Sequence, residues 1–150
     1  MLELLSPAGS MEALRAAVQN GANAVYLGVG NLNARQSAKN FTPQTLVDAV
    51  KYCHVRGVDV HLTLNTLVSD REMKEAAELI RHAAQYNIDA FIVQDLGVVQ
   101  LCRQIAPHIP IHGSTQMTIH SLPGVQLCAA MGMKRVVLSR ELSREEIRYI

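Results

Sequence analysis

The chain has 150 residues, is 49% hydrophobic and carries a formal net charge of +1. This composition excludes a disordered chain and predicts a globular domain with a sizeable core. No apolar run approaches the ~18 residues that a membrane-spanning helix needs. Near the N-terminus an acidic residue, Glu3, stands where a secretory signal would carry basic ones. We therefore expect a cytoplasmic protein with no membrane partner.

The predicted strands and helices alternate along the whole chain. Strands are expected near residues 2–5, 24–28, 58–64, 90–94, 109–112 and 135–139, with helices between them. Ser69 with Glu72, and Ser143 with Glu146, have the spacing of capping boxes at helix starts. The order predicts an α/β protein.

Four junctions of one kind connect predicted helices to predicted strands. They begin at Gly21, Gly57, Asn87 and Gly132. Glycine and asparagine best tolerate the left-handed backbone that ends many helices. A β-rich run follows each junction within one or two residues. This repeat predicts a parallel sheet with right-handed crossovers.

The length is compatible with two kinds of parallel sheet. A TIM-barrel-like (β/α)8 fold takes ~250 residues, so 150 residues hold about six of its units. We expect the N-terminal part of a single barrel domain, with the remainder of the barrel and any C-terminal domains outside this chain. An open doubly wound sheet is the alternative. Its GxGxxG fingerprint is missing after the first strand, where the sequence reads PAGS.

The longest connection, residues 29–41, is polar and rich in asparagine. Loops of this length in compact domains are frequently functional. In a barrel this loop lies at the C-terminal rim, where active sites are built. Arg35 and Lys39 are its charged residues and are candidates to hold an anion. A solvated loop without a specific role is the alternative.

The third predicted strand alternates apolar and polar residues. His61, Thr63 and Asn65 share one face, and Val60 and Leu62 lie on the other. A parallel strand covered by helices should be apolar on both faces. We therefore expect the polar face to point into the barrel, either as part of a site or as a structural hydrogen-bond cluster.

Polar residues also follow the other predicted strands, the arrangement of a ligand site in parallel α/β folds. The candidates for substrate binding and catalysis are Asn65, Gln94, His112, Ser114, Gln116, Arg140 and Glu141. Arg140 is expected to clamp a carboxylate through two hydrogen bonds. His112 and Glu141 are the candidates for proton transfer, with His112 expected to titrate near neutral pH. Asp95 is expected to cap the helix that follows it.

Several common chemistries leave no signature in the sequence. It contains no HExxH, GxSxG, P-loop or EF-hand motif. Cys53, Cys102 and Cys128 are widely separated and fall in helical patterns, as buried structural thiols do. We expect no metal site and no cofactor within the chain itself.

Six blocks, in order, make the chain resemble the N-terminal part of the peptidase U32 family. They are residues 3–9 (ELLSPAG), 21–28 (GANAVYLG), 63–66 (TLNT), 92–97 (IVQDLG), 112–116 (HGSTQ) and 137–143 (VLSRELS). The resemblance covers the whole chain and implies a TIM-barrel-like catalytic domain within a longer bacterial protein.

The resemblance implies two kinds of activity. Some members are described as collagenases or other proteases. Others take part in oxygen-independent hydroxylation of tRNA or ribosomal RNA, with prephenate as a source of the hydroxyl group and a 4Fe-4S cluster held by cysteines C-terminal to the region seen here. We expect the second activity, with a U32 peptidase as the alternative. A noncatalytic subunit paired with a second U32 protein is a third interpretation.

Overall fold

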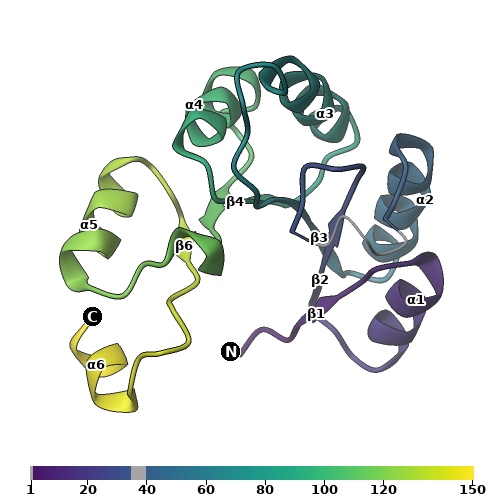
Figure 1. Cartoon of the computed structure of the whole chain (residues 1–150). Coiled ribbons are helices and arrows are strands. Elements are labelled where there is room, and N and C mark those ends of the chain that lie inside the picture. The colour runs from purple at the N-terminus through teal and green to yellow at the C-terminus, as the bar shows by residue number, and fades with distance from the viewer. Residues whose placement is uncertain (1, 35–39) are drawn as a thin grey trace.

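The computed structural model describes residues 2–34 and 40–150, which form a curled parallel sheet with helices along its outer side (Figure 1). The strands of these residues are β1 (Leu5–Pro7), β2 (Ala24–Gly28), β3 (Asp59–Leu64), β4 (Ala90–Val93), β5 (Ile111–Gly113) and β6 (Arg135–Val136). The α-helices are α1 (Met11–Gln19), α2 (Pro43–His54), α3 (Met73–Gln85), α4 (Leu96–Ile105), α5 (Leu122–Ala130) and α6 (Arg144–Tyr149). A 3-10 turn, η1 (Thr115–Met117), follows β5.

Each strand lies beside its neighbours in the chain, in the order β1 to β6, and every pair is parallel. A doubly wound sheet would reverse its order at a switch point. The uninterrupted order and the curl of the sheet are those of a TIM barrel, so the predicted fold class is confirmed. None of the helices in the described residues is long and apolar enough to cross a bilayer.

The four predicted helix-to-strand junctions have the expected backbone. The φ angles are 88° at Gly21, 68° at Gly57, 57° at Asn87 and 83° at Gly132. All four lie in the left-handed region, where a residue other than glycine or asparagine is strained. This repeated turn sets the direction of each strand after its helix.

The first and the last strand differ most from their predicted bounds, by three residues at one end, whereas the bounds of the other four agree within two residues. The first strand was expected at 2–5, but β1 begins at Leu5 and includes Pro7. A proline has no N–H to donate, and it is accepted here because β1 is an edge strand of the described sheet. The last strand was expected to run to 139, but β6 ends at Val136: the Val137 N–H still donates to the Gly113 carbonyl of β5, whereas the Ser139 N–H donates to the Ile119 carbonyl.

The helix caps agree with prediction except at α3. Ser143 and Glu146 form a capping box at α6, and the Asp95 carboxylate accepts from the N–H groups of Gly97 and Val98 at α4. Ser69 and Glu72 do not cap α3, which begins at Met73 without a side-chain cap. The Ser69 N–H and hydroxyl both donate to the Glu72 carboxylate, so this pair closes the turn before the helix.

The two faces of β3 have the predicted character. Val60, Leu62 and Leu64 are buried in the apolar core. His61 and Thr63 are on the other face and are also buried. Asn65, which follows the strand, is half-buried. The polar face therefore points into the barrel, as expected.

The two ends of the sheet are joined at the N-terminal ends of their strands. The Arg135 guanidinium at the start of β6 donates two hydrogen bonds, of 2.6 and 2.9 Å, to the Glu3 carboxylate just before β1. These residues are 132 positions apart. The ion pair connects the first and last described strands across the base of the curl.

Candidate functional site

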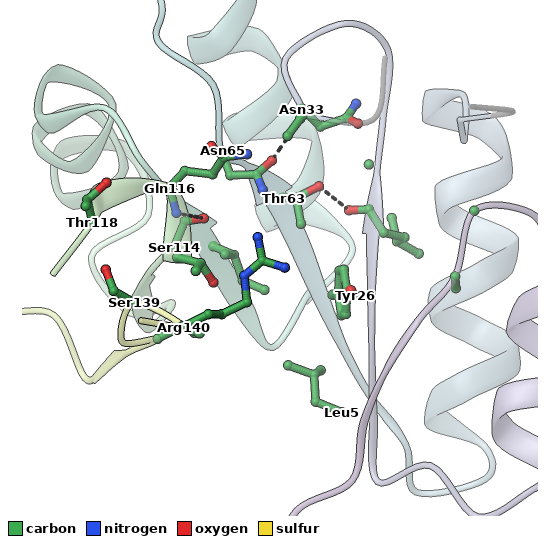
Figure 2. Close-up of a pocket in the computed structure, with 18 of the residues that line it drawn as sticks. Leu5, Tyr26, Asn33, Thr63, Asn65, Ser114, Gln116, Thr118, Ser139 and Arg140 are labelled. Carbon is green, nitrogen blue, oxygen red and sulfur yellow. Dashed lines mark hydrogen bonds between the residues drawn. The ribbon is translucent and has the colours of Figure 1, made fainter. Parts of the chain in front are cut away.

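A pocket of about 520 Å³ lies at the C-terminal ends of the strands (Figure 2). Its lining comes from the ends of β1 to β6 and the loops after them. The polar and charged members among the described residues are Tyr26, Asn33, Asn40, Thr63, Asn65, Ser114, Thr115, Gln116, Thr118, Ser139, Arg140 and Glu141. The predicted ligand-binding rim is therefore a concave site.

Five of the predicted site residues meet in this pocket: Asn65, Ser114, Gln116, Arg140 and Glu141. Gln94 does not line it, but its Nε2 donates to the Gln116 carbonyl at 3.2 Å and holds η1 beside the pocket. Arg35 and Lys39 lie outside the described residues. The described part of the 29–41 loop reaches the rim as expected, because Asn33 and Asn40 are lining residues.

Arg140 provides positive charge in the described lining. Figure 2 shows its side chain extending from the segment after β6 toward the middle of the labelled polar groups. No described residue makes an ion pair with its guanidinium. A free guanidinium with five N–H donors suits a carboxylate or a phosphate.

The floor of the pocket is made of neutral hydroxyl groups. The Thr63 hydroxyl donates to the Leu27 carbonyl at 3.0 Å, so its lone pairs remain for a ligand. The Ser114 Oγ accepts from the Gln116 N–H at 3.2 Å, so its proton remains for a ligand. Ser139 is buried and also faces the pocket. The floor can both donate to and accept from a polar molecule.

His112 is not a lining residue. It pairs in register with Ile92, and its ring packs edge-on against His61 with centroids 5.0 Å apart. Burial, and then the positive charges of His61 and Arg135, lower the pKa of His112 to about 4. The expectation that it titrates near neutral pH is therefore wrong, because the ring is inside the barrel rather than at its rim.

Several lining residues were not among the predicted site residues. Tyr26 lies in an apolar run of β2, where no alternation marks it. Thr118 has a left-handed backbone, with φ of 56°, at the end of η1. Ser139 lies in residues 137–143, one of the sequence blocks that carry the resemblance, and its position directly before Arg140 could have indicated it as a site residue.

The described residues do not fit an iron-sulfur cluster or another metal. No group of three or more His, Cys, Asp or Glu side chains among them is close enough to hold an ion. Cys53, Cys102 and Cys128 are buried on three different helices. Burial raises the thiol pKa of all three, to about 11 for Cys53 and about 12 for Cys102, which disfavours the thiolate that binds metal.

Comparison with known proteins identifies the family. The model of peptidase family U32 matches residues 9–150. The chain belongs to peptidase family U32. The U32 match includes every described lining residue of the pocket except Leu5 and Ala8.

Relatives of this U32 chain have names of two kinds. It is 42% identical over 143 residues to "tRNA hydroxylation protein P" of Helicobacter pylori, covering 95% of the chain and 34% of that protein. It is 38% identical over 149 residues to "23S rRNA 5-hydroxycytidine C2501 synthase" of Escherichia coli, covering 99% and 22%. It is 38% identical over 150 residues to "Uncharacterized protease MJ0090" of Methanocaldococcus jannaschii, covering 100% and 36%. The chain thus spans about a third or less of the length of these relatives.

A solved structure shares the fold. The chain resembles the U32 peptidase Mk0906 with a TM-score of 0.74 and 13% identity, over 92% of this chain and 58% of that one. At this identity the similarity concerns the fold alone.

Proposed function

We propose that the chain is the N-terminal part of the catalytic barrel of a longer U32 protein that hydroxylates RNA, either tRNA or 23S rRNA, without oxygen. The observation that carries the proposal is the Arg140 guanidinium, which makes no ion pair with any described residue, in a pocket whose other described polar groups are hydroxyls and amides apart from Glu141. This pocket suits a polar anionic small molecule, and prephenate is the proposed hydroxyl donor. The names of the RNA-hydroxylating relatives support this reaction class.

In this proposal the pocket residues bind and orient the donor. The Arg140 guanidinium holds a carboxylate through two hydrogen bonds. The free proton of Ser114 and the lone pairs of Thr63 contact the polar groups of the same molecule. Gln94 keeps Gln116 in place through the Gln116 carbonyl. Residues that hold the reacting groups in one geometry lower the entropic part of the barrier.

Proton transfer is assigned to Glu141, a pocket carboxylate. His112, the other candidate, holds the inner wall as a neutral ring, because its pKa is lowered to about 4. Its ring packs against His61, and His112 is not among the residues that line the pocket. A general acid or base must reach the proton that it moves.

An iron-sulfur cluster belongs in this proposal to the remainder of the parent protein, because the cysteines of this chain do not fit one. When bound there, a cluster supplies redox chemistry. RNA is the macromolecular partner. A second U32 subunit, with this chain in a noncatalytic role, is the proposed arrangement if the parent alone is inactive.

The first experiment uses the full-length parent, purified without oxygen. We expect stoichiometric iron and sulfide, and loss of a hydroxylated nucleotide from RNA of a strain lacking the gene. Parent protein carrying Arg140→Ala should fail to restore that nucleotide, whereas Arg144→Ala, a change at an exposed arginine outside the pocket, should restore it. An iron-free parent and unaltered RNA would reject the proposal.

A U32 peptidase is the second candidate, supported by the name of the archaeal relative. None of the described residues that line the pocket with Ser114 and Ser139 is a histidine, and the His112 ring packs on His61. A serine hydrolase needs a base within hydrogen-bond reach of its nucleophile. Cleavage of a collagen-like peptide by the iron-depleted parent would favour this candidate over RNA hydroxylation.

A further inference from the structure

The first part of the long rim loop is fixed against the sheet by several contacts. We define residues 29–34 as the rim segment. Val29 bridges to Phe41, and the Phe41 N–H donates to the Gly28 carbonyl at 3.0 Å. The Asn33 Nδ2 donates to the Gly30 carbonyl at 3.0 Å, inside the segment. These bonds fix the conformation of the rim segment next to β2, but none of them connects it to β3.

Gly28 provides a seat for the rim segment. A methyl group added at Gly28 would lie 2.4 Å from Asn33 Cγ, well inside any real contact between carbon atoms. Asn33 is buried, so it can lie over β2 only because Gly28 has no side chain. The sequence at both positions is therefore adapted to this close approach.

Asn65 connects the rim segment to β3. The Ala34 N–H donates to Asn65 Oδ1 at 3.1 Å, a bond between residues 31 positions apart (Figure 2). A backbone N–H can only donate, so the oxygen of the Asn65 amide must face Ala34. The Nδ2 group is then the part of this amide left for the pocket, and no described residue accepts a hydrogen bond from it.

We propose that Asn65 is a positioning residue with two separable roles: its Oδ1 holds the rim segment at Ala34, and its Nδ2 presents a hydrogen-bond donor to the ligand. The second role rests on the proposed function, in which the pocket takes an anion. Together the two roles mean that Asn65 always presents a hydrogen-bond donor, and not an acceptor, to the pocket. An amide free to flip would present either an acceptor or a donor.

Two substitutions separate the roles. Asn65→Asp keeps an oxygen acceptor for the Ala34 N–H but replaces the donor with a second acceptor and a negative charge. Asn65→Ala removes both groups. If the proposal is right, Asn65→Asp keeps the hydrogen bond from the Ala34 N–H but binds the anion more weakly. Asn65→Ala loses both the hydrogen bond from Ala34 and affinity for the anion.

The rim role is tested by hydrogen exchange of the Ala34 amide, followed by NMR in the full-length parent. Losing one neutral hydrogen bond should speed exchange of this amide by about 3- to 10-fold in Asn65→Ala, and by less than twofold in Asn65→Asp. Asn31→Ala is the matched control, because Asn31 is exposed in the same segment and does not line the pocket. The Leu62 amide, in the centre of β3, reports whether each variant is folded.

The ligand role is tested by calorimetric titration with prephenate. We expect Asn65→Asp to bind at least about 10-fold more weakly than wild type, as loss of a hydrogen bond to a charged group predicts. Equal exchange at Ala34 in wild type and Asn65→Ala would overturn the rim role, and equal prephenate affinity in wild type and Asn65→Asp would overturn the donor role. If wild type itself binds no prephenate, the proposed function and the donor role fail, while the exchange result still decides the rim role.

Discussion

At the scale of single residues, the chemistry of the pocket depends on which atoms are already committed to hydrogen bonds. The Thr63 proton is used by Leu27, the Asn65 oxygen by Ala34, and the Ser114 oxygen by Gln116. The Arg140 guanidinium has no such commitment among the described residues. It is therefore the group through which a charged ligand gains most.

Arg140→Ala should weaken prephenate binding to the protein by about 10- to 100-fold, the effect of losing charge-assisted hydrogen bonds. Arg140→Lys should recover only part of this affinity, because an ammonium group retains the charge but not the planar pair of donors. Calorimetric titration measures both variants against Arg144→Ala as the control. Equal affinities for all four proteins would show that the anion binds elsewhere.

His112 makes stability depend on pH in a defined window. Its ordinary pKa is 6.5, and burial lowers the pKa in the folded protein to about 4. Between these values the unfolded chain binds more protons than the folded one, so the free energy of unfolding falls as the pH is lowered. The lowered pKa of buried His61 acts with the same sign.

We expect the thermal midpoint to decrease as the pH falls from 6.5 toward 4, and His112→Asn to flatten this dependence. Circular dichroism melts at half-unit pH steps measure both proteins. A variant as pH-sensitive as wild type would show that His112 is protonated in the folded protein, contrary to its buried position.

At the scale of elements, four left-handed turns each connect a helix to the next strand. The free-energy cost of placing a residue other than glycine at such a turn can be measured. Gly57 and Gly9 both have open space where a methyl group would be added, but only Gly57 has a positive φ. Gly57→Ala should therefore destabilise the fold by about 1–2 kcal/mol, the cost of a left-handed non-glycine residue. Gly9→Ala should be close to neutral.

Urea unfolding of the two variants gives this comparison directly, because neither methyl group meets a neighbouring atom. Equal destabilisation by the two changes would mean that backbone conformation is not what the glycine at this junction provides.

Much of this element-level structure is contained in the sequence. Turn residues such as Gly21 and Asn87, and the alternation from Val60 to Asn65, act through local backbone geometry that a sequence reports. The depth of a residue in the barrel depends instead on the stagger between strands. His112 lies in β5 and Ser114 directly after it. The two residues are two positions apart, so the sequence places them on the same face, yet only Ser114 lines the pocket.

Tyr26 shows the same limit from the other side. Its neighbours in β2 are apolar, so the sequence does not mark it. Tyr26 lines the pocket because of its place in the sheet, where it pairs in register with Pro7 of β1 and His61 of β3. The end of the last strand was also not predicted: beyond β6 the Ser139 N–H donates to the Ile119 carbonyl, a partner 20 positions earlier that the strand pattern does not indicate.

At the scale of the whole molecule, the ion pair of Glu3 with Arg135 connects the ends of a sheet whose strands otherwise pair only with their chain neighbours. The Arg135 hydrogen bonds lower the pKa of Glu3. Both side chains are about a third or more exposed, so solvent screens the pair and its contribution to stability is modest.

A double-mutant cycle with Glu3→Gln and Arg135→Gln should give a coupling energy of about 0.5–1 kcal/mol at low salt, decreasing in 1 M salt. The pair Glu12→Gln with Arg135→Gln is the control and should show no coupling, because Glu12 is an exposed residue of α1 that makes no ion pair with Arg135. Chemical denaturation supplies the free energies. Zero coupling in the first cycle would show that this contact does not hold the two ends of the sheet together.

The pocket is lined by segments from the first and the last described strands, since Leu5, Ala8 and Gly9 line it together with Val137, Ser139, Arg140 and Glu141. During synthesis each β/α unit can pair with the preceding strand as it leaves the ribosome, but this pocket lacks part of its described lining until residue 141 has emerged. A molecule bound at this site therefore adds its binding energy only to molecules in which β1 to β6 are all in place. Its presence in the cell would favour these molecules over partly folded ones, which makes ligand supply a control on how much of the protein survives.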